Sequence, residues 1–385
     1  MPVFNASFTS KLPHAGTSIF AVMSKMAHEH QAINLSQGFP DFPISQTLIE
    51  RVYYFMKQGL NQYAPMPGVP VLRKAIADKA NRSYGISYDA DEEVTVTAGA
   101  TQALFTAITA FVMPQDEVII FEPAYDSYAP AVESCGGTVK GISLKLPDFH
   151  IDWQEVGRTI TAKTRMIILN SPHNPSGSLL SANDLDALEE LTRNTDIIIL
   201  SDEVYEHLIF DGYQHQSVCL NPSLASRALV VGSFGKTFHA TGWKTGFVMA
   251  PASLTKEFRK FHQFVVFASN TPIQYAIADF LSNPENYDGL GAFYQQKRDF
   301  FAKGLQNSSF DLYPCRGTYF QVLGYSRISK MPEMEFAEWL VKEHGVAAIP
   351  LAPFYSKPTN QQLLRFCFAK TEQTLSQAID RLCRI

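Results

Sequence analysis

The chain has 385 residues, of which 46% are hydrophobic and 18% charged, and its net charge is −5. This length suits one large domain with a second, smaller one, and the hydrophobic content excludes a disordered chain. No block of Lys or Arg stands out and no apolar stretch approaches the roughly 18 residues of a membrane helix, which excludes nucleic-acid and membrane partners. Five scattered cysteines and a start without a secretory signal predict a cytoplasmic protein.

The middle of the chain alternates short β-branched runs with helical stretches, which predicts an α/β fold. Strands are expected at 94–98, 117–121, 138–144, 165–170, 196–202, 228–233 and 246–250. Several of these runs are continuously apolar, as in a mostly parallel, seven-stranded sheet that is sandwiched by helices. An Ala-rich run at 100–112 predicts a helix.

The two ends of the chain predict a smaller α+β domain. The helices expected there are 285–306, 334–344 and 372–385, and the strands are 318–325, 346–350 and 363–369. The N-terminal segment is expected to join them. We therefore divide the chain into a large domain, 46–280, and a small domain made of 1–45 and 281–385.

Polar residues follow several expected strands. A doubly wound sheet binds its ligand outside the carboxyl ends of the strands, and 170–174, Asp202 and 233–236 all lie at such ends. At the start of the Ala-rich helix, the backbone N–H groups of Ala100 and Thr101 would face an anion. Neither GxGxxG nor GxxxxGK[ST] occurs, so dinucleotide and nucleoside-triphosphate sites lack their motifs.

Lys236 is the candidate nucleophile. A lysine must lose its proton to attack a carbonyl, and desolvation or a nearby cation such as Lys244 lowers its pKa. Small residues around both lysines, Ser233 among them, let a bulky ligand approach the backbone. A lone loop lysine is more often a surface residue, so this interpretation depends on its companions.

Asp202 ends an apolar strand, where a buried carboxylate needs a partner. A protonated pyridine nitrogen would be such a partner and would turn the ring into an electron sink, with Tyr205 bonded to a ring oxygen. A helix cap and a metal ligand are the alternatives. Asn174 could donate to the same oxygen and Tyr125 could stack on the ring, although a plain turn and a packed aromatic residue explain these two as well.

Arg365 interrupts an apolar strand. A buried guanidinium needs an anion, and its fork matches a carboxylate; the alternative is an internal salt bridge to an Asp or Glu. Gly38 would bring backbone close to a substrate carboxylate. Tyr63, in an N-terminal loop, would reach a phosphate, including that of a neighbouring subunit.

Together these segments resemble the class I aminotransferases, fold-type-I enzymes that use pyridoxal 5′-phosphate. The motifs occur in the family's order and span nearly the whole chain: INLSQGFPDF, NQYAPMPGVPVLRKAIA, VTVTAGATQAL, VIIFEPAYDSYAP, ILNSPHNPSG, LSDEVYEHL, SFGKTFHATGWKTGF and LLRFCFAK. The resemblance is strongest to the branch that holds the bacterial methionine aminotransferases and the kynurenine and glutamine aminotransferases.

The resemblance implies a role for each candidate residue. Lys236 would bond the cofactor and shuttle a proton, Asp202 would pair with the pyridinium nitrogen, and Tyr205 would complete the catalytic set. The residues implied to bind the cofactor are Ala100, Thr101, Tyr125, Asn174, Asp202, Tyr205, Ser233, Lys236, Lys244 and, from the other subunit, Tyr63. Those implied to bind the substrate are Gly38, Asn174, Arg365, Phe20 and Phe267.

The implied reaction is a ping-pong transfer of the α-amino group from methionine and other bulky neutral or aromatic L-amino acids to a 2-oxo acid. It would occur in a homodimer with shared sites and without a metal. The aromatic-rich segment 261–272 lacks arginine, which favours neutral substrates. The alternative is a kynurenine or glutamine aminotransferase with β-lyase activity on cysteine S-conjugates. A cofactor-binding regulator is a third hypothesis, but the chain has no spare DNA-binding segment.

Overall fold

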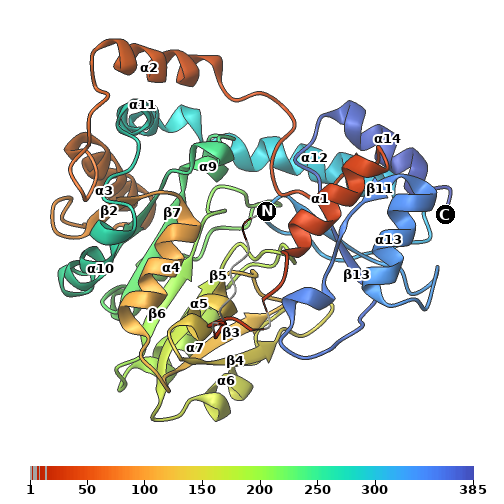
Figure 1. The fold of residues 1–385 in the computed structure, drawn as a ribbon, viewed down its shortest axis with the longest axis horizontal. Helices are drawn as coiled ribbons and strands as arrows, with labels where there is room; N and C mark the ends of the chain where they lie inside the picture. The colour runs from red at the N-terminus through yellow and green to blue at the C-terminus, as the bar shows by residue number, and fades with distance from the viewer. Residues whose placement is uncertain (1, 3–6, 8, 14) are drawn as a thin grey trace.

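A seven-stranded sheet forms the centre of the computed structural model, which describes residues 2, 7, 9–13 and 15–385 (Figure 1). Its order is β2-β8-β7-β6-β5-β3-β4, and β8 runs antiparallel to its two neighbours while the other pairings are parallel. The strands are β2 (Val94–Thr97), β3 (Glu117–Glu122), β4 (Thr138–Ser143), β5 (Thr164–Asn170), β6 (Ile198–Asp202), β7 (Ala228–Ser233) and β8 (Gly246–Met249). Each expected strand is present, and the mostly parallel α/β sheet is confirmed.

Both faces of this sheet are buried, as the continuous apolar runs predict. In β3, Val118 and Ile120 belong to one hydrophobic cluster while Ile119 and Phe121 belong to another. The first cluster lies under α4 (Ala100–Phe111), α5 (Tyr128–Ser134) and α10 (Ala252–Val265), and the second includes residues of α3 (Pro70–Tyr84), α7 (Ala182–Thr192) and α11 (Thr271–Ser282). Each fully buried Val or Ile contributes roughly 1.5–3 kcal/mol, so the two-sided packing fixes the sheet that carries the site.

A smaller antiparallel sheet lies beside the large one (Figure 1). Its order is β12-β13-β10-β9, and a separate parallel pair joins β1 to β11. The strands are β1 (Ile33–Asn34), β9 (Asp311–Leu312), β10 (Phe320–Gly324), β11 (Val346–Ala347), β12 (Ile349–Pro350) and β13 (Leu363–Cys367). The helices of this region are α1 (Ile19–Glu29), α12 (Leu290–Gly304), α13 (Glu333–His344) and α14 (Glu372–Leu382).

Two expected elements of this region are wrong in detail. The single strand expected at 346–350 is split, because β11 pairs with β1 of the N-terminal segment while β12 pairs with β13. The helix expected from 285 begins only at Leu290, since Pro284–Asn286 forms a separate 3₁₀ turn that the Asn283 side chain caps. The N-terminal segment does pair with the C-terminal part, but the domain boundaries at 45/46 and 280/281 stay a prediction.

Within the described residues, no helix is both long enough and apolar enough to cross a membrane.

Candidate active site

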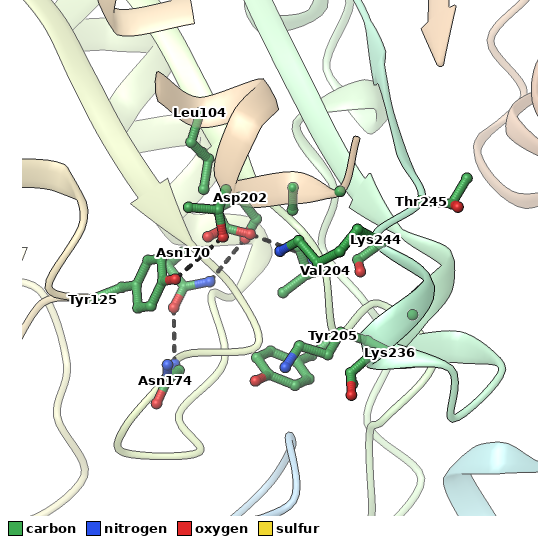
Figure 2. Close-up of a pocket in the computed structure, with 16 residues that line it drawn as sticks. Leu104, Tyr125, Asn170, Asn174, Asp202, Val204, Tyr205, Lys236, Lys244 and Thr245 are labelled. Carbon is green, nitrogen blue, oxygen red and sulfur yellow. Dashed lines mark hydrogen bonds between the residues drawn. The ribbon is translucent and has the colours of Figure 1, made fainter. Parts of the chain in front are cut away.

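A cavity of about 210 Å³ opens where β5, β6 and β7 end, beside the start of α4 (Figure 2). Asn170, Asp202 and Ser233 are the last residues of these three neighbouring strands, so the sheet brings together side chains that lie far apart in sequence. The residues expected from the sequence that line this cavity are Ala100, Thr101, Tyr125, Asn174, Asp202, Tyr205, Ser233, Lys236 and Lys244.

Asp202 is buried at the end of β6 and is held from two sides. The Tyr128 hydroxyl donates to its carboxylate at 2.6 Å, and the Asn170 side chain donates to its backbone carbonyl at 2.9 Å. Burial raises the pKa of Asp202 to about 6. Because the desolvated anion is costly, this carboxylate is poised to pair with a cation that enters the cavity. Among the described residues, no group of three or more His, Cys, Asp or Glu side chains could hold a metal ion.

Lys236 follows β7 in the one-turn helix α9 (Phe234–Thr237) and points its amine toward the cavity. The pKa of this amine is lowered to about 8, chiefly by burial; Arg365 and Lys244 act in the same direction, while Cys367 and Asp202 oppose the shift. About a tenth of the amine is therefore unprotonated at pH 7, far more than for a lysine with the ordinary pKa of about 10.4. The cationic setting expected around Lys236 is present, but desolvation is the larger cause.

The opposite wall of the cavity is built for an anion. Gly99 precedes α4 with φ 81°, and no side chain caps the free N–H groups of that helix. A Cβ on Gly99 would lie only 3.3–3.4 Å from the end of the Lys244 side chain, so glycine leaves room for the ammonium group beside the helix start. Helix N-termini and ammonium groups both attract phosphate.

These walls fit pyridoxal 5′-phosphate. The helix start with Lys244 suits the phosphate, the buried Asp202 suits a protonated ring nitrogen, and the Lys236 amine suits the aldehyde. Tyr125, whose hydroxyl lies 3.2 Å from that of Thr101, supplies an aromatic ring to the same cavity.

Arg365 adjoins this cavity from the smaller sheet. It is 1% exposed and donates to the Asn174 side-chain oxygen and to the Ser36 carbonyl, both at 2.8 Å. Its guanidinium lies over the ring of Phe320 at 3.9 Å and over that of Phe20 at 5.1 Å. No carboxylate forms a salt bridge with Arg365 in the described chain, so the internal salt bridge considered above is wrong, and its Nε has no partner.

The remaining expected residues lie outside the cavity lining. The Gly38 carbonyl accepts a hydrogen bond from the Tyr319 hydroxyl at 2.6 Å. Tyr63 is 82% exposed and packs edge-to-face against Phe267, with ring centroids 5.1 Å apart. Within one subunit these two rings therefore stay at the surface, and their roles remain predictions.

Two further residues, Tyr128 and Tyr319, contact the site although nothing in the sequence indicates it. Asn170, which the sequence places at a strand end without a specific role, hydrogen-bonds the backbone of Asp202. Tyr128 and Tyr319 carry no local signal, because their contacts depend on how distant segments pack.

Comparisons with known proteins identify the family of the chain. The family model described as aminotransferase class I and II matches residues 30–382. The chain is 52% identical to the methionine aminotransferase of Escherichia coli K12 over 97% of each chain, and 35% identical to human kynurenine–oxoglutarate transaminase 1 over 94% of this chain and 93% of that one. A crystal structure of an Escherichia coli protein with a methionine aminotransferase function superposes with a TM-score of 0.97 at 51% identity, covering 99% and 100% of the two chains. A Thermus thermophilus aspartate aminotransferase gives 0.90 at 29% identity, covering 98% and 99%.

Proposed function

The chain belongs to the class I and II aminotransferases, and from this premise we propose that it transfers the α-amino group of methionine, and of other bulky neutral or aromatic L-amino acids, to a 2-oxo acid. Pyridoxal 5′-phosphate, the cofactor of this family, supplies an aldehyde carbon and an electron-accepting ring when bound. The observation that carries the proposal is the meeting of the Lys236 amine, the Asp202 carboxylate and the start of α4 in one cavity.

The residues that would hold the cofactor divide by chemistry. Those assigned to the phosphate are Ala100, Thr101, Ser233, Lys244 and, from the other subunit, Tyr63. Tyr125 would stack on the ring, Asn174 and Tyr205 would bond the ring oxygen, and Asp202 would keep the ring nitrogen protonated.

The proton chemistry is assigned to Lys236. Its Nζ would bond the cofactor at rest and would be freed when an amino acid takes its place. The free amine would then take the α-proton from the bound amino acid and deliver it to the carbon that was the cofactor's aldehyde carbon. Hydrolysis by one water would release the carbon skeleton as a 2-oxo acid and leave the amino group on the cofactor, and a second 2-oxo acid would take up that amino group in the reverse sequence, with release of one water.

Several contacts support a neutral or aromatic side chain on the substrate. Phe20 and Phe354 lie with ring centroids 5.8 Å apart beside Arg365 and offer an apolar wall. Arg259, the arginine nearest in sequence to the aromatic-rich segment 261–272, already donates to Thr95 and to two backbone carbonyls. It is therefore engaged and not aimed at a second carboxylate. Phe267 and Tyr63 would complete the wall from the partner subunit.

A panel of amino donors tests this substrate choice. We expect methionine and phenylalanine to change the cofactor absorbance of the purified enzyme faster than aspartate does, because aspartate would place a second carboxylate against apolar rings. A faster reaction with aspartate would contradict the proposal. The relatives named as kynurenine transaminases keep one alternative open: release of pyruvate and ammonia from a cysteine S-conjugate without any 2-oxo acid would favour β-lyase activity.

We further propose a cytoplasmic homodimer. Large apolar and aromatic residues that are exposed in the single subunit include Tyr53, Tyr63, Phe264, Val265 and Phe267. Exposed patches of this kind are typical of interfaces. Sedimentation velocity should give about twice the mass of one chain, and a monomer would contradict the shared site.

Replacement of Arg365 by alanine should weaken recognition of the α-carboxylate. We expect kcat/KM for methionine to fall by an amount that corresponds to a loss of about 2–5 kcal/mol in transition-state stabilisation. This is the range for leaving a buried charge without its partner. Arg73→Ala is the matched control, because Arg73 of α3 is also buried but pairs with Asp91 and does not line the cavity. An unchanged KM for methionine in Arg365→Ala would remove Arg365 from the site.

A further inference from the structure

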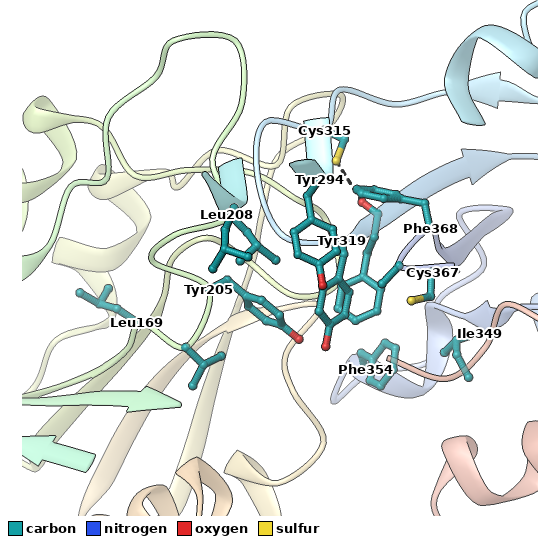
Figure 3. Close-up of a cluster of buried hydrophobic side chains, with 14 of the residues drawn as sticks. Leu169, Tyr205, Leu208, Tyr294, Cys315, Tyr319, Ile349, Phe354, Cys367 and Phe368 are labelled. Carbon is teal, nitrogen blue, oxygen red and sulfur yellow. Dashed lines mark hydrogen bonds between the residues drawn. The ribbon is translucent and has the colours of Figure 1, made fainter. Parts of the chain in front are cut away.

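The hydroxyl of Tyr319 bridges the catalytic lysine and the N-terminal segment. Lys236 Nζ donates to Tyr319 Oη at 2.9 Å, and Tyr319 Oη donates to the Gly38 carbonyl oxygen at 2.6 Å. The Tyr319 ring is fully buried and packs edge-to-face against Tyr205 with ring centroids 5.2 Å apart (Figure 3). Tyr319 is thus the side chain that hydrogen-bonds the amine in the absence of a ligand.

The direction of this bridge fixes the amine. A tyrosine hydroxyl has one hydrogen, and here it is used on the Gly38 carbonyl, so Tyr319 Oη can only accept from Lys236. An uncharged amine has two hydrogens and one lone pair. With its hydrogens directed to Tyr319 and, at 3.4 Å, to Gly38, the lone pair is directed away from both acceptors, and Lys236 lines the cavity.

The far end of the bridge cannot shift easily. A Cβ on Gly38 would lie 2.8 Å from the Phe320 ring, so the segment packs tightly on the smaller sheet. The Asn34 side chain accepts from the backbone N–H groups of Ser36 and Gln37 at 3.0 and 3.3 Å, and the Gln37 side chain donates to the Phe20 carbonyl at 3.1 Å. The Gly38 carbonyl therefore offers Tyr319 a fixed acceptor.

We propose that Tyr319 is a positioning residue for the transamination assigned above: it holds the freed Lys236 amine so that its lone pair faces the reacting carbon. This inference rests on the proposed function, since an amine that carries a proton between two atoms must stay close to both of them. A lysine side chain has four flexible bonds and little intrinsic order. The same segment contacts both residues that would position the substrate and the amine: the Ser36 carbonyl accepts from Arg365, and the Gly38 carbonyl accepts from Tyr319.

Tyr319→Phe removes the bridge and keeps the ring. We expect kcat for methionine to fall roughly 10- to 100-fold, the loss typical of a misplaced reacting group, while KM changes little because Arg365 is untouched. The isotope effect with α-deuterated methionine should rise, since proton transfer becomes the slow step. The Gly38 carbonyl, 3.4 Å from Nζ, remains as a long hydrogen-bond acceptor in this variant, so the amine keeps one of its two anchors and loses the shorter one.

A second readout does not depend on the loaded enzyme. In cofactor-free protein, the rate at which an amine reagent modifies Lys236 follows its deprotonation, with peptide mass spectrometry to identify the site. Loss of an acceptor disfavours the ammonium form, so the pH midpoint in Tyr319→Phe should lie below the wild-type midpoint. The charged and titratable groups around the amine, Asp202, Lys244, Arg365, Tyr205 and Cys367, are the same in both proteins.

Tyr325→Phe is the matched control. Tyr325 is also fully buried and also donates to a backbone carbonyl, that of Met331 at 2.8 Å, but it packs on Phe336 away from the cavity. It should keep the wild-type kcat and pH midpoint. Tyr319→His keeps an aromatic ring with an acceptor nitrogen and should recover part of the rate. It also provides a second test of Tyr319 if the phenylalanine variant does not fold.

The outcomes separate the two proposals. A wild-type kcat and a wild-type midpoint in folded Tyr319→Phe would overturn the role of Tyr319 and leave the aminotransferase assignment intact. A wild-type protein that binds pyridoxal 5′-phosphate but transfers no amino group would overturn the proposed function itself.

Discussion

Replacement of Lys236 by alanine is expected to abolish amino-group transfer. The pKa of this amine on the cavity wall is lowered to about 8, so it can both attack a carbonyl and carry a proton near neutral pH. General acid–base catalysis alone accounts for about 10²–10⁴-fold in rate, and loss of covalent capture adds to it. We therefore expect a fall of at least ~10⁴-fold in kcat.

Borohydride reduction provides the measurement that does not depend on rate. The wild-type chain should gain the mass of the reduced cofactor at Lys236, and Lys236→Ala should gain none. Lys244→Ala is the control, since it removes a cation from the anion-binding wall but leaves the Lys236 amine in place. It should still capture the cofactor, at a higher concentration. Mass gain in Lys236→Ala, or transfer at a comparable rate, would contradict the assignment.

The fold was predictable where the pattern is local. Continuous apolar runs such as 228–233 can be stable only as strands covered on both faces, and helix-length stretches between them leave few other arrangements. The site followed from one topological rule, because parallel strands end at a common edge. Asp202 and Lys236 were therefore predictable as neighbours from the sequence, although Asp202 ends β6 and Lys236 follows β7.

The rest depends on contacts between distant segments. Nothing in the run 346–350 shows that its first half pairs with Ile33–Asn34 and its second half with β13. Tyr319 meets Lys236 only because the smaller sheet packs against the cavity, and Tyr128 meets Asp202 only across α5 and β6. Such residues look like ordinary core aromatics in the sequence, and only their hydroxyl partners distinguish them.

Replacement of Asp202 by asparagine should separate activity from stability. Removing the anion leaves a protonated ring nitrogen without its buried partner, which costs roughly 3–5 kcal/mol in comparable pairs, or about 10²–10⁴-fold in kcat. Asparagine keeps an oxygen for the Tyr128 hydroxyl, so the fold should persist. Tyr128→Phe is the milder control, because it removes one hydrogen bond but leaves the carboxylate charged.

The same replacement, Asp202→Asn, should raise the stability of the cofactor-free protein at pH 8, although it lowers the activity. Burial raises the pKa of Asp202 from 3.8 to about 6, so its neutral form stabilises the fold below pH 4 and that contribution is lost as the pH rises through 6. Asparagine does not titrate, so cofactor-free Asp202→Asn should match the wild type near pH 4 and be more stable at pH 8, by on the order of 3 kcal/mol. Urea unfolding of both cofactor-free proteins at the two pH values gives the comparison. Equal stability at pH 8 would mean that the ionised Asp202 does not destabilise the cofactor-free fold. It would then contradict the assignment of Asp202 as a buried partner of the ring nitrogen.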